Sequence, residues 1–201
     1  MTTPTIGAAA VKDLRERTGA GFMDCKRALE ETEGDLEKAV ALLRERNQAS
    51  AARKAGRDAR EGLVYSYIHT GGRIGSLIEV NCETDFVART DEFQKLVREL
   101  AMQVVALRAQ YPTIESIPEA VVEAKRAQLL ADETVQAKPA ALQGQIVEGQ
   151  LKKWYQLVAL AEQPFRDTEM TVGQLILSSI AKIGENIRVR RFVRFELGEE
   201  S

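Results

Sequence analysis

Small or apolar positions alternate with polar ones between Ile74 and Cys82, which is the pattern of a β-strand with one buried face. The positions of that face are Ile74, Ser76, Ile78, Val80 and Cys82. The same period of two occurs just before this segment, where the alternate positions are Leu63, Tyr65 and Tyr67. Because residues 70–72 between them read Thr-Gly-Gly, which favours a turn, the two segments are predicted to form a β-hairpin.

Apolar residues spaced three and four apart predict three short helices within residues 1–46. Gly19 and Gly21 separate the first two helices, and Gly34-Asp35 offers a C-terminal glycine followed by an N-cap for the third. The predicted core positions are Val11, Leu14, Cys25, Ala28, Leu29, Leu36, Ala39, Val40 and Leu43. Residues 47–61 are rich in alanine and charge and lack large apolar side chains, so they are predicted to form a helical linker.

Helical spacing returns after Asp85, and the strand ending at Cys82 is predicted to run straight into one long helix that Tyr111-Pro112 stops. Its inward positions are predicted to be Phe93, Leu96, Val97, Leu100, Ala101, Val104 and Leu107. Further helices are predicted after Pro118 as far as Leu130, before Trp154, and from Thr171 to Gly184.

A third strand signal lies at residues 184–198. Alternation assigns Ile187, Val189, Val193 and Phe195 to one face and Arg188, Arg190, Phe192 and Arg194 to the other, and Arg191 interrupts the apolar face. A hairpin joined antiparallel by this last strand, with helices on one face, is an α+β arrangement. We therefore predict a three-helix domain (1–46), a helical linker (47–61) and an α+β core (62–201).

The loop at residues 81–85 joins the alternating strand to the helix that follows it. Thr84 or Asp85 can cap that helix by accepting backbone N–H bonds, and Phe86 follows the cap immediately. Two interpretations of Phe86 are open at this point: a hydrophobic staple that packs on its own helix, or an apolar contact presented to a partner.

Phe22 and Met23 form a second apolar pair, directly after the Gly19-Ala20-Gly21 turn. They can close the small core of the three helices as a lid, or they can be presented to a partner, for which the adaptable methionine side chain is suited. Periodicity alone does not decide between the two.

The charge balance indicates a protein partner rather than nucleic acid. Lys+Arg 28 against Asp+Glu 30 gives a net charge of -2, whereas general nucleic-acid binding requires a basic surface. An alternative is an RNA-binding strip along the last strand, formed by Arg188, Arg190, Phe192 and Arg194. Direct nucleic-acid binding is not expected.

The chain carries no recognisable pattern for catalysis, cofactor binding or metal binding. Cys25 and Cys82 are far apart and lack a C-x-x-C spacing, so they are predicted to be small buried apolar residues of a reduced protein. A small hydrolase using Cys82 or His69 is a second alternative, and it requires both side chains in one pocket. The first residues lack the features of a signal peptide, and no apolar stretch is long enough to span a membrane, so we expect a cytoplasmic protein.

Four segments resemble the elongation factor Ts family, whose members are guanine-nucleotide exchange factors of elongation factor Tu. They are VKDLRERTGAGFMDCKRALEE, NCETDFVAR, IVEGQLKKWYQLVALAEQPF and GENIRVRRFVRFE. The first resembles the ubiquitin-associated-like domain of the family, in which the usual pair at the turn is Met-Met, so Phe22 is a departure.

The resemblance implies which residues touch elongation factor Tu. The Asp85-Phe86 pair, flanked by Thr84 and Val87, is expected to enter the GTPase domain and disturb its Mg²⁺ and phosphate surroundings. Arg15, Phe22 and Met23 are expected to hold the same domain from another side, and contacts with other domains of the partner are expected too.

The resemblance covers essentially the whole chain and is to the short form of the family, which has one core subdomain where longer members have two. Some short members carry a cysteine in the last strand that links two subunits, whereas Val193 stands between Phe192 and Arg194 here. We therefore expect any homodimer to be non-covalent.

Overall fold

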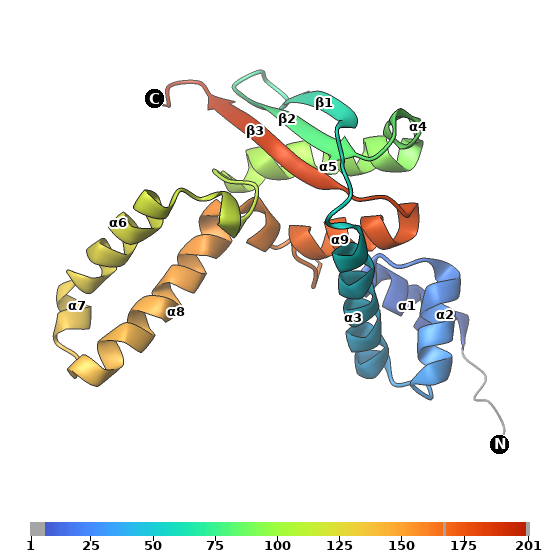
Figure 1. Cartoon of the computed structure of the whole chain (residues 1–201), viewed down its shortest axis with the longest axis horizontal. Helices are drawn as coiled ribbons and strands as arrows, with labels where there is room; N and C mark the ends of the chain where they lie inside the picture. Colours follow the sequence, from blue (N-terminus) through green and yellow to red (C-terminus); the bar gives the residue numbers. More distant parts are fainter. Residues whose placement is uncertain (1–6, 167, 200–201) are drawn as a thin grey trace.

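The computed structural model describes residues 7–166 and 168–199. Residues 1–6, which open the predicted 1–46 domain and the segment compared with a signal peptide, lie outside this part of the chain. Three bodies are seen in Figure 1: a group of helices near the N-terminus, a sheet with helices on one side, and a long helical arm.

The N-terminal helices form around their own small core, as their apolar spacing predicts. The first helix ends where Gly19 adopts a left-handed conformation (φ 66°), and Asp35 caps the third by accepting the Lys38 N–H (3.1 Å). The bounds are Ala8–Thr18 for α1, Phe22–Glu31 for α2 and Leu36–Lys54 for α3. The third helix is therefore not short: it continues beyond residue 46 to Lys54, and Ala51 is buried in the main core.

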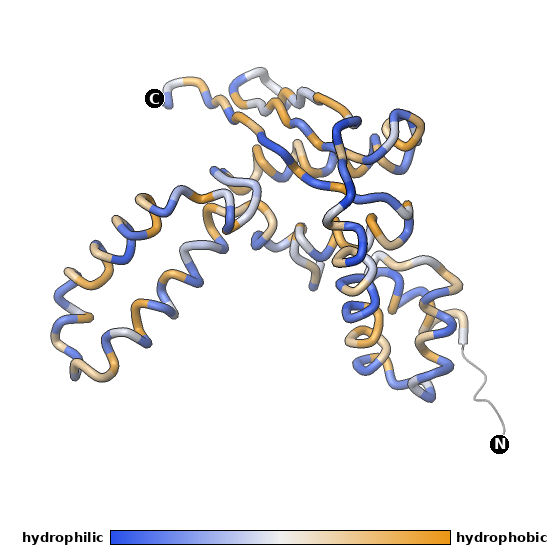
Figure 2. Tube along the Cα trace, in the orientation of Figure 1, coloured by the Kyte–Doolittle hydropathy of each residue, from blue (hydrophilic) through white to orange (hydrophobic). Residues whose placement is uncertain are grey.

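The sheet has the antiparallel order β1-β2-β3 in the described part of the chain, as predicted. The strands are Glu61–Ile68 for β1, Ile74–Cys82 for β2 and Arg188–Glu196 for β3. Helix α5 (Asp91–Leu107) covers one face, where Ile78, Val80 and Phe93 are buried. In Figure 2, hydrophobic positions recur along β2 and α5, while the segment joining α3 to β1 is mainly hydrophilic.

The predicted faces of the last strand are wrong beyond Val189. A β-bulge lies opposite Glu79 and Val80, where Arg191 pairs with Glu79 but Val189 pairs with Val80, so Arg190 is an extra residue. One extra residue reverses the parity of every side chain that follows it. Phe192 consequently packs against the core, whereas Val193 and Phe195 are exposed on the open face.

The predicted single helix after the loop is also wrong in detail, because it is interrupted. A one-turn helix α4 (Asp85–Ala88) ends at Arg89, and α5 begins afresh after Thr90, whose Oγ1 accepts the Phe93 N–H (3.3 Å). Helix α5 ends at Leu107, before Tyr111-Pro112, because Arg108 adopts a left-handed conformation with φ 52°.

The arm consists of α6 and α8, which run side by side and meet through the short α7 (Figure 1). Its own apolar cluster centres on Val135, Val147 and Leu151. The bounds are Glu119–Leu130 for α6, Glu133–Gln136 for α7 and Ala140–Val158 for α8, and two short 3-10 helices, Ile114–Ser116 and Leu160–Glu162, lie at its base. Buried Gln163 joins the arm to α5, because its Nε2 donates to Leu157 O (2.9 Å) and Leu107 O (3.0 Å).

Helix α9 (Val172–Ile183) lies between the N-terminal helices and the sheet (Figure 1). Thr171 and Gln174 form a capping box at its start, and Gly184, with φ 92°, ends it as predicted. The helix packs along α3 and also contributes Val172 and Ile180 to the main core. This position lets α9 fix the N-terminal helices against the α+β core.

Candidate functional site

The predicted loop forms a sharp corner at the end of β2. Thr84 has an extended backbone (φ -127°, ψ 150°), and its Oγ1 accepts the Val87 N–H at 3.3 Å, as expected of an N-cap. Its carbonyl oxygen accepts the Ala88 N–H at 3.3 Å and closes the single turn of α4. Thr84, rather than Asp85, is therefore the cap.

This turn points Phe86 away from the protein. The Phe86 side chain is 78% exposed, whereas Ala88 is buried and Val87 is half-buried against the main core. A staple would require Phe86 to pack on its own helix, so the staple interpretation is wrong. An apolar ring exposed on a capped turn is free to contact a partner.

Asp85 is exposed beside Phe86 and forms an ion pair with Arg89, with 2.7 Å between Oδ2 and Nη2. Exposed pairs of this i,i+4 kind contribute only about 0.3–0.5 kcal/mol. The carboxylate can therefore exchange Arg89 for a group on a partner at little cost.

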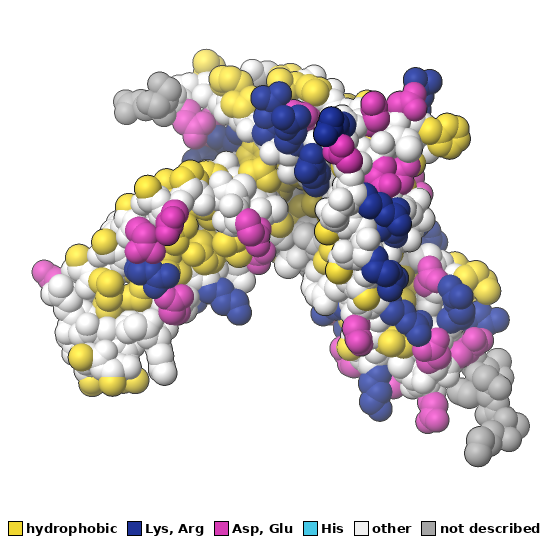
Figure 3. Space-filling model, in the orientation of Figure 1, with side chains coloured by type: hydrophobic (Ala, Val, Ile, Leu, Met, Phe, Trp, Pro, Cys, Tyr) yellow, Lys and Arg dark blue, Asp and Glu magenta, His cyan; other side chains and the backbone are white. Residues whose placement is uncertain are grey.

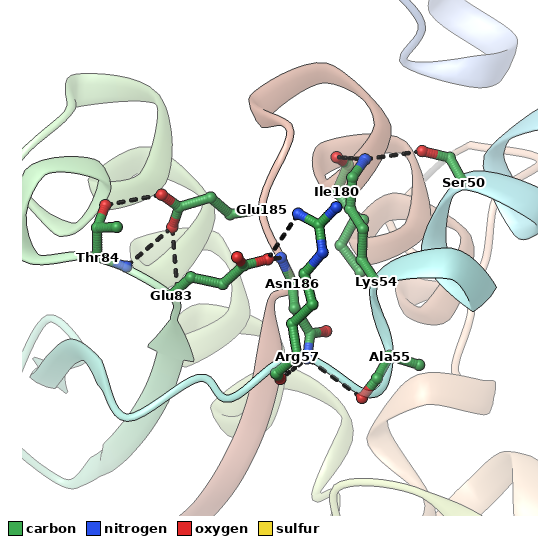
Figure 4. Close-up of polar contacts among 9 residues, drawn as sticks. All are labelled: Ser50, Lys54, Ala55, Arg57, Glu83, Thr84, Ile180, Glu185 and Asn186. Atoms are coloured by element: carbon green, nitrogen blue, oxygen red, sulfur yellow. Dashed lines mark hydrogen bonds and ion pairs between the residues drawn. The ribbon is translucent and has the colours of Figure 1, made fainter.

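A residue distant in sequence holds the loop in place. The Glu185 carboxylate, from the segment between α9 and β3, accepts the N–H groups of Glu83 (3.0 Å) and Thr84 (3.1 Å). The Thr84 hydroxyl donates to the other carboxylate oxygen of Glu185 at 2.7 Å. Figure 4 shows these contacts beneath the corner. The motif GENI could have singled out Glu185, but its partners are more than a hundred residues away.

Phe22 and Met23 begin α2 and are 53% and 60% exposed. The buried face of that helix consists of Cys25, Ala28 and Leu29, so the interpretation of Phe22 and Met23 as a core lid is wrong. The pair is a second exposed apolar group on the surface.

The predicted contact residues fall into two separate groups. Thr84, Asp85, Phe86 and Val87 lie on the α+β core, and Arg15, Phe22 and Met23 lie on the N-terminal helices, where Arg15 is exposed on α1. Figure 3 shows hydrophobic groups projecting beside α4 and beside the start of α2, on the same side of the molecule. A partner on that side can meet both groups.

The geometry contradicts the hydrolase alternative. Cys82 pairs with Glu61 at one end of the hairpin, while His69 follows the other end at Ile68. Seven residues of strand separate Glu61 from Ile68, so Cys82 and His69 lie roughly 23 Å apart or more. This distance is too long for proton transfer between the two side chains. Burial also raises the pKa of the Cys82 thiol to about 11, opposite to the change a nucleophile needs.

The structure does not support the alternative of an RNA-binding strip. The bulge turns Phe192 into the core, and Arg190 and Arg191 both bond the Glu79 carboxylate, at 3.1 and 2.7 Å. The Arg191 hydrogen bond in particular lowers the pKa of Glu79, so this carboxylate stays ionised and pairs with both guanidinium groups. Stacking on nucleic acid requires a free aromatic face beside free cations. Phe192, the aromatic residue of this strip, packs against the core and does not offer one.

Two further properties of the described residues bear on function. None of their helices combines the length and apolar character needed to cross a bilayer. Across the same residues, no three side chains of His, Cys, Asp or Glu are grouped as metal ligands would be.

Comparison with known proteins agrees with the resemblance of the four segments. The family model for elongation factor TS matches residues 8–199. The elongation factor Ts of Thermoanaerobacter sp. (strain X514) is 56% identical over 195 residues, which span 96% of each chain. That of Carboxydothermus hydrogenoformans is 55% identical across 96% of this chain and 90% of its own, and that of Synechococcus sp. (strain JA-3-3Ab) is 53% identical across 97% and 70%. The chain therefore belongs to the elongation factor Ts family.

Proposed function

We propose that this protein binds elongation factor Tu carrying GDP and promotes release of the nucleotide, as a guanine-nucleotide exchange factor of translation elongation. The observation that carries this proposal is Phe86, an aromatic ring 78% exposed on a capped turn in a chain of this family. The ring does not contribute to the fold, because truncating this exposed side chain would uncover no core residue.

Exchange of this kind depends on two binding events that oppose one another. If docking of this chain weakens GDP binding to the partner, GDP must weaken docking by the same factor. Both effects arise from interactions that form only in the nucleotide-loosened state of the partner. The chain makes and breaks no covalent bond in this scheme, so we do not assign it an enzymatic reaction.

The two exposed groups take different parts. Phe86 inserts into the GTPase domain and Asp85 disturbs the surroundings of its Mg²⁺ and phosphate, while Thr84 and Val87 shape the turn that carries them. Phe22 and Met23, with Arg15, bind the same domain elsewhere. Translation elongation takes place in the cytoplasm, so we propose that the protein acts in that compartment.

The open face of the sheet supports a second proposal, that two copies of the chain associate. Opposite α5 this face carries exposed Val64, Ile68, Leu77, Val193 and Phe195. Leu77 and Val193 are directly paired, as are Gly75 and Phe195, so the apolar area is continuous. Figure 3 shows hydrophobic groups along the top of the molecule, over the strands of the sheet. A second copy has the same face, and a two-fold pair of such faces covers both.

Release of labelled GDP from purified elongation factor Tu tests the main proposal. The release rate, followed with excess unlabelled GDP, is expected to rise with the concentration of this protein and to reach a plateau. A rate that stays at its spontaneous value at every concentration refutes the exchange activity.

A further inference from the structure

Four residues beneath the Phe86 corner bind one another across three distant parts of the chain. Glu83 lies before α4, Glu185 and Asn186 lie between α9 and β3, and Arg57 lies between α3 and β1. We call Glu83, Glu185 and Asn186 the loop bracket. Figure 4 shows the bracket between the corner and the end of α3.

The first part of the bracket is reciprocal. The Glu185 carboxylate accepts the Glu83 and Thr84 N–H groups, as described above, and the Glu83 carboxylate accepts the Asn186 N–H at 2.6 Å. Each glutamate therefore satisfies backbone donors of the segment that carries the other. Hydrogen bonds to an ionised acceptor are roughly twice as strong as neutral ones.

The second part fixes the segment that leads out of α3. The buried Asn186 carboxamide donates to Arg57 O at 3.0 Å and to Ala55 O at 3.5 Å, and Arg57 Nη1 lies 3.5 Å from the Glu83 carboxylate. One turn earlier, Lys54 Nζ donates to Ser50 Oγ (2.8 Å) and to Ile180 O of α9 (3.2 Å). The end of α3 is thereby bound to the same segment as the corner.

The corner needs this support. Helix α4 is a single turn, and a single turn has little stability of its own, because fixing its backbone costs more than its hydrogen bonds return. Phe86 supplies no packing to offset that cost, since its ring is in water. Val87 and Ala88 pack on the core at the end of the turn, and the bonds to Glu185 hold the N-cap residue Thr84 at its start.

We propose that the loop bracket is a positioning device, which fixes the direction of Phe86 and its place relative to Phe22 and Met23 so that one partner can meet both groups at once. This inference rests on the proposed exchange function. A ring already oriented loses less conformational freedom on binding, and two contacts on one rigid body reinforce each other.

The first test uses Glu185→Ala, with Glu133→Ala on the exposed α7 as a matched removal of one carboxylate. Glu185→Ala is expected to slow catalysed GDP release roughly tenfold or more, because a hydrogen bond to a charged acceptor contributes about 1.5–3 kcal/mol. Glu133→Ala should leave it unchanged. Glu185→Gln, which keeps one acceptor oxygen, should recover part of the rate and serves as the working variant if Glu185→Ala does not fold.

A double-mutant cycle separates positioning from general weakening of the fold. If Glu185 acts by placing Phe86, Glu185→Ala should cost little more once Phe86→Ala is present. If the double variant slows GDP release by the product of the two single effects, the two residues act independently and the proposal is overturned. An unchanged rate in Glu185→Ala overturns it as well.

Asn186→Ala tests the other half, because it frees the segment after α3 but leaves Glu185 on the loop. It is expected to weaken binding to nucleotide-free partner in the wild-type background and to have little effect when Met23→Ala is also present. An equal loss in both backgrounds overturns the idea that the bracket couples the two groups.

Amide hydrogen exchange tests the bracket independently of the proposed nucleotide-exchange function. The Glu83 and Thr84 amides should exchange slowly in the wild-type protein and at least tenfold faster in Glu185→Ala, since their acceptor is lost. If the wild-type protein does not accelerate GDP release from elongation factor Tu while these amides behave as stated, the exchange function is refuted and the bracket is supported. Equal amide rates in the two proteins overturn the bracket.

Discussion

Thr84 Oγ1 accepts the backbone N–H of Val87 at 3.3 Å, and this contact determines where the exposed aromatic ring lies. The bond closes a single helical turn, in which successive side chains point about 100° apart. Val87 and Ala88 face the core, so Phe86, just before them, faces solvent. An interaction within four residues thus turns an apolar side chain outward.

Phe86→Ala should slow catalysed GDP release roughly ten- to a hundredfold, because burying a phenylalanine in a partner contributes roughly 1.5–3 kcal/mol. The melting temperature should not change, since the ring is exposed. Stopped-flow release of a fluorescent GDP analogue measures the first quantity and calorimetry the second.

Phe195→Ala is the matched control, because it removes the same ring at nearly the same exposure, 69%, from the open face of the sheet. It should leave the exchange rate per chain close to wild type, measured at equal oligomeric state. Equal slowing by both substitutions would show that the effect of Phe86 is not specific.

Asp85→Ala should slow GDP release less than Phe86→Ala does, by roughly two- to threefold, because an exposed carboxylate is easily replaced by water. The variant also frees Arg89, whose only contact with Asp85 is an exposed ion pair, so the fold should be unaffected. Asp85→Asn, measured in the same assay, tells loss of charge from loss of the side chain. A slowing that equals that of Phe86→Ala would contradict the ranking.

Phe22→Asp should weaken association with elongation factor Tu roughly tenfold or more, because it places a charge where an apolar contact is proposed. The helix itself should not suffer, since an acidic residue in the first turn of α2 favours the helix dipole. Met23→Ala should act in the same direction, and titration calorimetry against nucleotide-free partner measures both. Unfolding of the N-terminal helices without a change in the affinity of the folded fraction would refute the contact.

The sequence predicted what depends on regular spacing. Helices α1, α2 and α9 and the hairpin follow from apolar positions at intervals of three and four, or of two. The faces of β3 could not be predicted, because the bulge at Arg190 shifts the parity and arises from pairing with a strand more than a hundred residues away.

The same distinction holds for the candidate site. The cap at Thr84 and the apolar residues Phe22 and Phe86 could be found from local sequence, but their exposure could not, because a lid and a presented contact have the same spacing. The hold of Glu185 on the loop rests on hydrogen bonds between segments that only the fold brings together.

Self-association should give a non-covalent dimer whose mass is the same in reducing and in oxidising buffer. The two cysteines are buried, and Val193 occupies the position at which a bridging thiol would stand on the open face. Sedimentation at micromolar concentration measures the mass. Phe195→Asp should give a monomer because it places a charge in the apolar face, whereas Phe86→Ala should remain dimeric. A monomeric wild type under both conditions would refute the proposal.

Cys82 should make the free energy of unfolding fall as the pH rises above about 8.5. Burial, followed by the charge of Glu185, raises the pKa of this thiol to about 11, while an unfolded cysteine titrates near 8.5. Below about 8.5 both states keep the proton and the contribution is fully present. Between about 8.5 and 11 the unfolded state binds fewer protons, so stability is lost by at most about 1.4 kcal/mol per pH unit.

Comparison of slopes isolates this effect from the other groups that titrate in the same range. Cys82→Ala should be less stable than wild type at pH 7, since it removes a buried side chain, but its stability should fall less steeply between pH 8.5 and 11. Val80→Ala, on the same inward face of β2, should lower stability and keep the wild-type slope. Denaturant unfolding at a series of pH values gives all three curves. Parallel curves for wild type and Cys82→Ala would mean that the thiol ionises as readily in the folded protein as in the unfolded chain, which would refute the prediction.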